Sequence, residues 1–553
     1  MNKFGTGAKI DADYQAQKRP FLLLILLVML ALAAGAFLAY CTDYAPWGFS
    51  DSAAYFSAAR NLAAGHSLSV TTADGGLTPL NLHAPLYSLV LAIFAKFGAN
   101  LIHVSKIMDI GFWTLFIFLC GWLFFKITGR QVEAFCFALA CAFSTPLVTS
   151  YSSLMSEPLA LVLGIPGFLL LALAVREGSR RLLILSAVCI GLSVMTRFAF
   201  AAVLAAGALV ILVFSAQHWR KRWVELFIFG AIGFAPMGVW MLVQKLQHVS
   251  TGGRSLIFTD LLSKIRNFAA AVWNTLKYWL PYRTNMIPGV RAKYFTPLLA
   301  MGFILLVVVG IYIAVRTQKK DVMKDSAFLV AGSSVLFILS YLAVLVAGYA
   351  FTSPSHDIND RILSPLYPAI IALLLSSALL AGTLVKGKAL AHILAVVVTL
   401  FFVVFNFELL RTYGLHSSKY PNGYTSPYWN SSRIFEVIQK LPPGTAMASN
   451  APDITLFYTN YLPYCLTENP TKRGDCLSAA DQSKLQDFVE RKCGVLILFP
   501  SSPTENYENY ADPISQASMD GLAKLYPALF RAPPGVILYS PECTGLRESL
   551  AGE

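Results

Sequence analysis

Charged side chains are scarce in this sequence. They make up only 13% of its 553 residues, whereas hydrophobic residues make up 56%, and the mean hydropathy is +0.59. A soluble protein of this length carries much more charge on its surface, so the composition excludes a soluble multidomain enzyme. Apolar runs of about 20 residues, each long enough to cross roughly 30 Å of hydrocarbon, recur from Phe21 to Phe407. We therefore predict a polytopic α-helical membrane protein.

Two kinds of motif are also missing. The sequence has no CxxC pair or histidine cluster that suggests a zinc site, and no glycine-rich loop of the kind that binds nucleotides. Four of the nine cysteines lie in the last quarter of the chain: Cys465, Cys476, Cys493 and Cys543. In an oxidising compartment this even number predicts one or two disulfides, with Cys465 and Cys476 as the local pair.

Long apolar runs stop after Phe407, which predicts a membrane domain over 1–407 and a soluble domain over 408–553. The first segment holds 31 Lys and Arg against 15 Asp and Glu, and the second holds 12 against 15. The net charge of +13 therefore belongs to the membrane part, and it does not imply a nucleic-acid partner. In the soluble part, GTAMASN, CGVLILFP and GVILYSPE are typical of strands, while PDITLFYTN and SQASMDGLAKLYP are typical of helices, which predicts a small α/β unit.

The topology follows from the basic clusters, because short loops rich in Lys and Arg stay in the cytoplasm. These clusters are Lys18–Arg19, Lys126–Arg130, Arg176–Arg181, Arg220–Arg222, Arg316–Lys324 and Lys386–Lys388. They predict an N-terminus inside, a C-terminal domain outside, and about eleven membrane helices near 21–39, 106–125, 132–150, 156–175, 182–196, 198–216, 224–243, 296–315, 326–350, 362–382 and 389–407. The basic start can also be read as a signal peptide, but without an evident cleavage site we interpret it as an anchor.

Two long outer loops result, over 41–105 and 244–294. The run Ala84–Phe97 does not cross, because an odd number of crossings must lie between the outer end of the first helix, at Ala39, and the inner anchor at Lys126, and this run is the shorter of the two candidates. The second loop carries seven basic residues between Ser250 and Tyr294 against one acid, so we expect an anionic partner there. Its phrase AAAVWNTLKYWLPYR predicts an interfacial amphipathic helix, with Trp273, Trp279 and Tyr282 at the level of the lipid headgroups and Lys277 and Arg283 near lipid phosphates. General adhesion to acidic lipid explains the same pattern.

This topology gathers five polar residues at the outer ends of helices or in outer loops. They are Asp51, His83, Glu157, Arg197 and Arg361. Ionisable groups near hydrocarbon are costly unless they pair or line a wet cavity, so their shared side predicts one site.

The order of these residues resembles the GT-C superfamily of membrane glycosyltransferases, in particular the branch of the protein O-mannosyltransferases and the lipid A aminoarabinose transferases. The family has an acid in its first outer loop, followed by a Tyr and an A..L..G motif. The matching residues of this sequence are Asp51, Tyr55, Ala59, Leu62 and Gly65. The later phrases are His83-Ala84-Pro85-Leu86, Ser156-Glu157-Pro158, Thr196-Arg197, and Arg361 ahead of Pro365 and Pro368. The resemblance covers roughly 10–410. It departs at Ala84, where the family has a second Pro, and at Asp51, where many mannosyltransferases have an Asp-Glu pair.

The resemblance implies an inverting transfer of a sugar from a polyprenyl-phosphate donor to an acceptor hydroxyl of a glycan, glycolipid or protein. The reaction would take place on the outer side of a bacterial inner membrane. Asp51 is then the expected base, with Glu157 as the second catalytic candidate. Arg197 and Arg361 are the expected phosphate ligands, followed by Lys277 and Arg283. His83 would orient the acceptor or a metal, and the residues neither require nor rule out a divalent cation.

Each of these residues also has a purely structural interpretation. Asp51 fits a helix cap ahead of Ala53, and Glu157 fits a cap ahead of Pro158. His83 fits a hydrogen bond to a loop carbonyl, and Arg361 fits a pair with Asp357 or Asp360. Two other function classes stay open, a membrane transporter and a non-catalytic lipid-binding scaffold. A transporter usually has internal repeats and broken helices at the middle of the membrane, and we find neither in the sequence; its charges would lie in the middle of spans, whereas those singled out here lie at outer ends.

Overall fold

The computed structural model describes residues 20–72, 75–248, 255–256, 259–279, 301–305, 307–308, 312, 325–353, 358–384, 388–468, 476–500, 514–543 and 545–546. The chain divides into two compact units. The first, here the helical unit, comprises Met1–Ala39, Asp109–Tyr151 and Ser156–Gly414. The second, here the mixed unit, comprises Tyr40–Met108, Ser152–Met155 and Leu415–Glu553.

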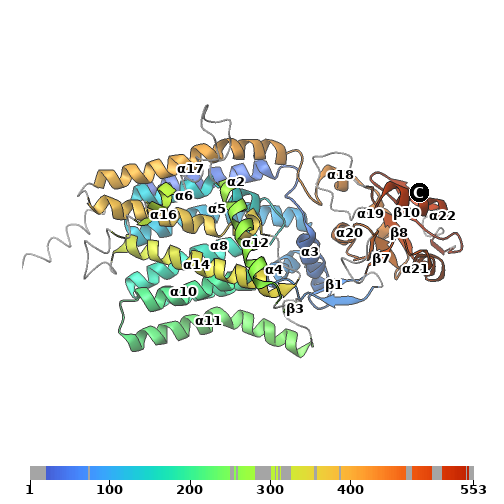
Figure 1. The fold of residues 1–553 in the computed structure, drawn as a ribbon, viewed down its shortest axis with the longest axis horizontal. Coiled ribbons are helices and arrows are strands. Elements are labelled where there is room, and N and C mark those ends of the chain that lie inside the picture. Colours follow the sequence, from blue (N-terminus) through green and yellow to red (C-terminus); the bar gives the residue numbers. More distant parts are fainter. Residues whose placement is uncertain are drawn as a thin grey trace, which may run out of the picture. The chain divides into compact units, whose positions relative to one another are not determined.

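Long apolar helices make up the helical unit, and several of them run side by side in Figure 1. Its helices are α2 (Phe21–Cys41), α5 (Leu101–Thr128), α6 (Gln131–Ala142), α7 (Thr145–Tyr151), α8 (Glu157–Glu177), α9 (Arg180–Thr196), α10 (Ala201–Phe214), α11 (Trp219–Leu246), α12 (Leu261–Trp279), α14 (Ser326–Phe351), α15 (Asp360–Leu363), α16 (Leu366–Leu384) and α17 (Lys388–Ser417). Small residues let them approach closely, as membrane helices require. A Cβ on Gly191 of α9, for example, would lie 2.6 Å from the carbonyl oxygen of Gly233 in α11.

Six helices among the described residues are long and apolar enough to span a membrane: α2, α5, α8, α11, α14 and α17. The bent pair α6 and α7 makes a seventh if the two form one span. Our sequence prediction treats them as one straight run, but they meet at an angle of 60°. Pro146 in the first turn of α7 has no N–H, so the ladder of α6 cannot continue through it. The remaining apolar helices are shorter, and the run at 296–315 lies mostly outside the described residues.

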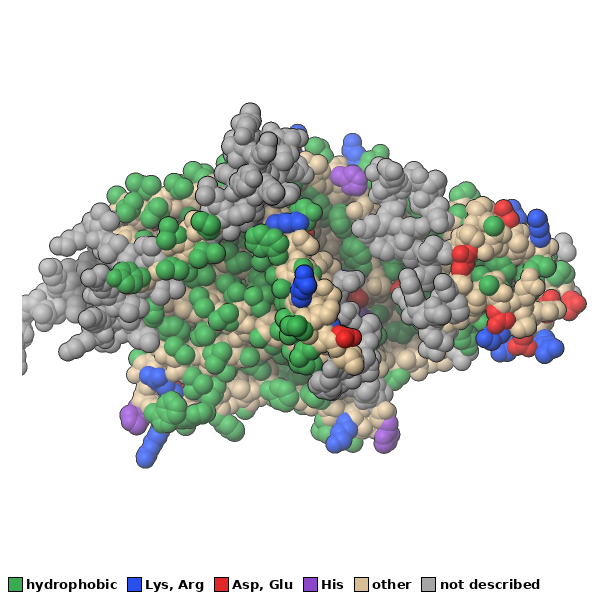
Figure 2. Space-filling model, viewed as in Figure 1, with side chains coloured by type: hydrophobic (Ala, Val, Ile, Leu, Met, Phe, Trp, Pro, Cys, Tyr) green, Lys and Arg blue, Asp and Glu red, His purple; other side chains and the backbone are tan. Residues whose placement is uncertain are grey.

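The surface of the helical unit is strongly apolar. Figure 2 shows hydrophobic side chains spread over the flank of the long helices. On α11, the side chains of Phe227, Val239 and Leu246 are 76%, 62% and 72% exposed. Only 17% of the most apolar stretch of this helix is buried in the protein. Exposed apolar surface on this scale is characteristic of a protein whose helices face lipid.

One end of the helical unit brings together several predicted inner clusters. Arg176, near the end of α8, donates from Nη1 to the carbonyl oxygens of Lys126 and Ile127 at 2.7 and 2.5 Å. Near the first turns of α6 and α17, Glu133 Oε1 lies 2.7 Å from His392 Nδ1. The clusters at 126–130 and 176–181 thus lie side by side at one end of the bundle.

A six-stranded sheet forms the centre of the mixed unit, in the order β7-β6-β5-β8-β10-β9. Its strands are β5 (Met447–Ser449), β6 (Tyr464–Thr467), β7 (Leu477–Ser478), β8 (Val495–Leu498), β9 (Ala528–Ala532) and β10 (Gly535–Leu538). The strands β7, β6, β5 and β8 run parallel to one another, whereas β10 is antiparallel to both β8 and β9. Short helices flank the sheet: α18 (Pro427–Asn430), α19 (Ile434–Gln439), α20 (Pro452–Thr459), α21 (Gln482–Gln486), the π-helical turn η4 (Asp487–Arg491) and α22 (Gln516–Leu525).

The five elements predicted in this segment are present as β5, α20, β8, α22 and β10. Two disulfides join its cysteines, Cys465 to Cys476 and Cys493 to Cys543, which confirms the predicted local pair and adds the second. Both disulfides hold segments of the sheet region together. The first joins Cys465 in β6 to Cys476, directly before β7, and the second joins Cys493, shortly before β8, to Cys543, which follows β10.

The segment 40–108 packs with the C-terminal residues in this same unit. It contains α3 (Ser50–Ala63), the hairpin of β1 (Ser69–Thr71) and β2 (Leu77–Pro79), and α4 (Leu86–Lys96). Phe56 of α3 stacks on Phe457 of α20 with ring centroids 5.4 Å apart, and Arg60 donates to the carbonyl oxygen of Phe457 at 3.1 Å. With only 11 residues, α4 is too short to span a bilayer upright, in agreement with its predicted non-crossing place.

Candidate functional site

Glu157 is the centre of an ion-pair cluster in the helical unit. Its Oε1 lies 3.0 Å from Nε of Arg361 and also pairs with Nη1 of Arg197. The Glu157 side chain is only 4% exposed, whereas those of Arg197 and Arg361 are 18% and 28% exposed. The structure therefore brings together three of the seven residues singled out in the sequence.

Three separate helix ends hold this cluster. Glu157 is the first residue of α8 and precedes Pro158, which is tolerated there because first-turn N–H groups need no helical partner. Arg197 follows the last residue of α9 in an extended conformation. Arg361 lies in the short helix α15, whose N-cap Asn359 accepts a hydrogen bond at Oδ1 from the N–H of Ile362 at 3.2 Å. Each of the three charged residues lies where an apolar run begins or ends, so the helix that forms from the run places the charged side chain at its end.

Two further hydrogen bonds fix the backbone around Arg361. The hydroxyl of Tyr341 in α14 donates to the carbonyl oxygen of Ile362 at 2.8 Å, and this contact is buried. The hydroxyl of Ser364 donates to the carbonyl oxygen of Arg361 itself, also at 2.8 Å. The Arg361 guanidinium is thus presented from a backbone segment with little freedom to move.

Two of the structural alternatives do not describe these residues. Glu157 takes part in a bridge between two arginines instead of capping α8, whose N-cap is Ser156. Arg361 reaches Glu157, while its neighbour Asp360 accepts a hydrogen bond from Trp279. Asp357 lies outside the described residues.

Asp109 is a fourth ionisable residue of the region, and our sequence analysis missed it. It lies in α5, is 1% exposed, and is within electrostatic range of Glu157. No described residue donates a hydrogen bond to either of its carboxylate oxygens, and the Trp113 indole N–H and the Tyr151 hydroxyl are likewise unpartnered. The rings of Trp113 and Tyr151 lie 4.7 Å apart. A single acid inside a long apolar run is the signal that could have identified it.

Asp51 and His83 belong to the mixed unit. Asp51 occupies the second position of α3, and the N-cap is Phe49, whose N–H donates to Ser52 Oγ at 2.9 Å. The helix therefore starts without Asp51 as its cap. The His83 ring lies 5.0 Å from that of Tyr55, and Tyr55 packs edge-on against Tyr87 at 5.2 Å.

The basic loop is described only in part. Lys277 lies on α12, donates to Asn274 Oδ1 at 2.9 Å and lies 5.4 Å from the ring centre of Tyr278. Arg283 lies outside the described residues. The helix begins earlier than expected, at Leu261, and one of its predicted interfacial aromatics is misplaced: Trp279 is 8% exposed and faces the protein. Trp273, in contrast, is 50% exposed.

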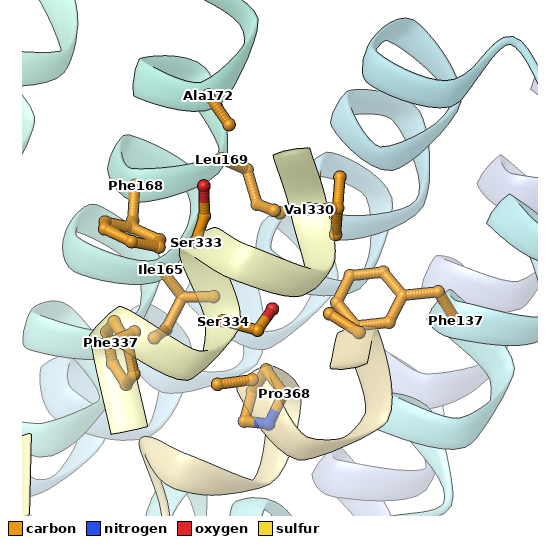
Figure 3. A pocket seen from close by; sticks show the side chains of 12 residues that line it. Phe137, Ile165, Phe168, Leu169, Ala172, Val330, Ser333, Ser334, Phe337 and Pro368 are labelled. Atoms are coloured by element: carbon orange, nitrogen blue, oxygen red, sulfur yellow. The ribbon is translucent and has the colours of Figure 1, made fainter. Parts of the chain in front are cut away.

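An apolar crevice opens between α6, α8, α14 and α16 (Figure 3). Phe137, Phe168, Phe337 and Pro368 are among its walls, and the hydroxyl of Ser333 on its lining has no described hydrogen-bond partner. Its free volume is about 20 Å³, which is room for one water molecule. A lipid chain could enter only if these side chains moved. Elsewhere, no group of three His, Cys, Asp or Glu side chains among the described residues is arranged to hold a metal.

Comparison with known proteins finds similarity at the level of structure. No family model matches the sequence, and no curated protein matches it. Among solved structures, ArnT from Cupriavidus metallidurans bound to undecaprenyl phosphate has a TM-score of 0.54 and 12% identity, with 92% of this chain and 97% of that chain covered. The oligosaccharyltransferase of Archaeoglobus fulgidus has a TM-score of 0.47 and 11% identity, with coverage of 86% and 69%. EmbB from Mycobacterium smegmatis, an arabinosyltransferase, has a TM-score of 0.33 and 12% identity, with coverage of 74% and 42%. This chain therefore has the same fold as ArnT. ArnT belongs to the GT-C membrane glycosyltransferases, the superfamily that the order of this chain's sequence motifs resembles.

Proposed function

We propose that this chain is an inverting glycosyltransferase that moves a sugar from a polyprenyl-phosphate donor to an acceptor hydroxyl. The observation that carries the proposal is the cluster of Glu157, Arg197 and Arg361 at converging helix ends of a GT-C fold. The structurally similar ArnT was solved with undecaprenyl phosphate, a donor carrier of the same chemical class. A glycan, glycolipid or protein serves as the acceptor.

The two arginines suit the phosphate of such a donor. A guanidinium has five N–H donors in a rigid fork that matches phosphate oxygens. Arg197 and Arg361 are each partly exposed, while Glu157 is buried between them, so the cluster as a group carries one excess positive charge. That charge stabilises the phosphate as it leaves, and a stable phosphate anion needs no strong general acid.

Glu157 then acts mainly on the arginines. Its buried carboxylate already bridges the guanidinium groups of Arg197 and Arg361. Its role is to hold both arginines in place. Asp51 is the proposed base that takes the proton of the acceptor hydroxyl, and His83 is proposed to orient the acceptor or a metal. Lys277 and Arg283 are secondary contacts for the donor phosphate or neighbouring lipid.

The topology proposed for this reaction has about eleven spans, and the site lies on the outer side of a bacterial inner membrane. Residues 408–553 form the extracytoplasmic α/β domain, and α17 carries the chain into it without a break up to Ser417. Two observations support this arrangement: the disulfides of the sheet region, which suit an oxidising compartment, and the contact between the predicted inner clusters at 126–130 and 176–181.

A transfer assay tests the proposal. Purified protein in lipid nanodiscs is incubated with polyprenyl-phosphate sugars that carry a radiolabel, together with a membrane extract as acceptor. We expect label to move from the lipid to the acceptor or to water, and Arg361→Ala to reduce this movement strongly. If no polyprenyl-phosphate sugar is turned over by the wild-type protein, although it binds the carrier, the chain is a lipid-binding scaffold. Sugar carried intact across sealed vesicles would instead identify a transporter.

A further inference from the structure

Trp279 and Asp360 join two parts of the helical unit that are far apart in the sequence. The indole Nε1 of Trp279 donates to Asp360 Oδ1 at 2.8 Å. Trp279 is the last residue of α12, and Asp360 is the first residue of α15, directly before Arg361. The amphipathic helix is therefore connected to the segment that presents Arg361 to Glu157.

The indole of Trp279 is largely enclosed by protein on the side that faces Asp360 and Tyr367. Trp279 is 8% exposed, and its ring packs edge-on against that of Tyr367 in α16 with centroids 5.8 Å apart. A buried donor that loses its acceptor costs more than the net value of the bond, because it cannot turn to water instead. The contact with Asp360 therefore holds the C-terminal end of α12 in one position.

The other end of α12 is also attached. Lys264 Nζ donates to the carbonyl oxygen of Ala350 in α14 at 3.1 Å. Because Tyr341 of α14 holds the Ile362 carbonyl, α14 and α12 together secure the backbone on both sides of Arg361. The remaining face of α12 is exposed and partly apolar, with Leu262 at 82% and Trp273 at 50%.

We propose that Trp279 is a positioning residue for the donor-phosphate site: through Asp360 it fixes α15, so that Arg361 meets Glu157 in the orientation that binds phosphate. This inference rests on the proposed function and deepens it. Arg361 touches the donor, whereas Trp279 acts only through Asp360. The packing of α12 thereby determines the affinity for donor, and a change in α12 affects binding more than the chemical step.

The test uses the full-length protein in nanodiscs with matched tryptophan variants. Trp279→Phe removes the N–H and keeps an aromatic ring on Tyr367, and Trp273→Phe is the control on the exposed face of the same helix. Asp360→Asn keeps an oxygen acceptor for the indole, while Asp360→Leu removes it. The readouts are the KM and kcat for a polyprenyl-phosphate sugar, and amide hydrogen exchange of the segment 359–366.

We expect Trp279→Phe and Asp360→Leu to raise the donor KM about tenfold, equivalent to about 1.4 kcal/mol, with a smaller change in kcat. Both should accelerate exchange in 359–366. Asp360→Asn should lie near the wild type, and the double variant Trp279→Phe/Asp360→Leu should be no worse than the worse single one. Trp273→Phe should change neither readout.

The positioning role is overturned if Trp279→Phe behaves like Trp273→Phe in exchange, or if exchange rises while the donor KM stays the same. Loss of kcat alone would also overturn it. A wild-type protein without transferase activity would contradict the proposed function instead. The hydrogen-exchange measurement would still decide whether Trp279 holds α15.

Discussion

Arg361 Nε lies 3.0 Å from Oε1 of Glu157, a carboxylate almost completely enclosed by protein. The pair connects the start of α8 to the short helix ahead of α16, and the same oxygen also holds Arg197. Glu157 pairs with both arginines, so its loss removes the negative charge that the two guanidinium groups share, whereas loss of one arginine leaves a neutral pair. Single substitutions in the cluster should therefore have measurable effects.

Removing the charge of Glu157 should destabilise the protein. Glu157→Gln leaves two guanidinium groups facing each other without a carboxylate, and the partial exposure of both arginines limits the cost to about 2 kcal/mol. We expect a lower unfolding temperature in nanodiscs. The control is Glu408→Gln, which breaks the exposed pair with Arg411 and should leave the unfolding temperature nearly unchanged, because water screens this pair. Equal effects of the two variants would contradict a structural role for Glu157.

Arg361→Ala and Arg197→Ala should weaken donor binding. The loss of a charge-assisted contact to phosphate costs about 1.5 to 3 kcal/mol, which is a decrease in affinity of roughly 10-fold to more than 100-fold. Equilibrium binding of a polyprenyl phosphate measures this directly. Arg266→Ala, at an exposed position of α12, is the matched control and should bind normally. If both cluster variants bind and turn over donor normally, the phosphate site lies elsewhere, and Lys277→Ala becomes the next test.

Asp51→Asn should separate catalysis from folding. Asn has the size of Asp but cannot take a proton, and α3 does not rely on Asp51 as its cap. Expression and donor binding should therefore stay close to wild type, while the transfer rate falls by a factor on the order of 10² or more. Asp43→Asn, at an exposed position of the same unit, should have no effect on transfer. Near-normal transfer by Asp51→Asn would mean that the base must be sought at Glu157.

Much of the site could be predicted from sequence because its residues interrupt apolar runs. Glu157, Arg197 and Arg361 stand at the ends of such runs, where polar residues are costly unless they have partners. Their mutual pairing could not be predicted, since it depends on how helices far apart in the chain pack. Trp279 was interpreted as a lipid-facing aromatic for a related reason: hydropathy does not distinguish a tryptophan at the lipid surface from one whose N–H finds a buried partner.

The fold shows the same division. The alternation of strands and helices in the C-terminal segment was readable from local composition, and β5, β8 and β10 lie where it predicts them. The bend between α6 and α7 could not be predicted from local composition, because both helices are apolar and only Pro146 marks the break. The packing of α3 against α20 was also not predicted, since it joins segments almost four hundred residues apart.

Thiol labelling tests the proposed sidedness of the mixed unit. Cys465, Cys476, Cys493 and Cys543 are paired, and the other five cysteines are free. Protein purified without reductant and then denatured should therefore react with five equivalents of an alkylating reagent, and with nine after reduction. Mass spectrometry counts the adducts. Nine adducts before reduction would place these cysteines in a reducing compartment and reverse the proposed topology.

A structure determined with a polyprenyl phosphate bound tests the central claim most directly. We predict that the phosphate lies within hydrogen-bond distance of the guanidinium groups of both Arg197 and Arg361, with Glu157 still paired to them. The same experiment on Arg361→Ala, at equal carrier concentration, should show the phosphate site empty or weakly occupied. A phosphate bound in the wild-type protein away from both arginines would contradict the account, because the Glu157 cluster would then be only a structural link between helices.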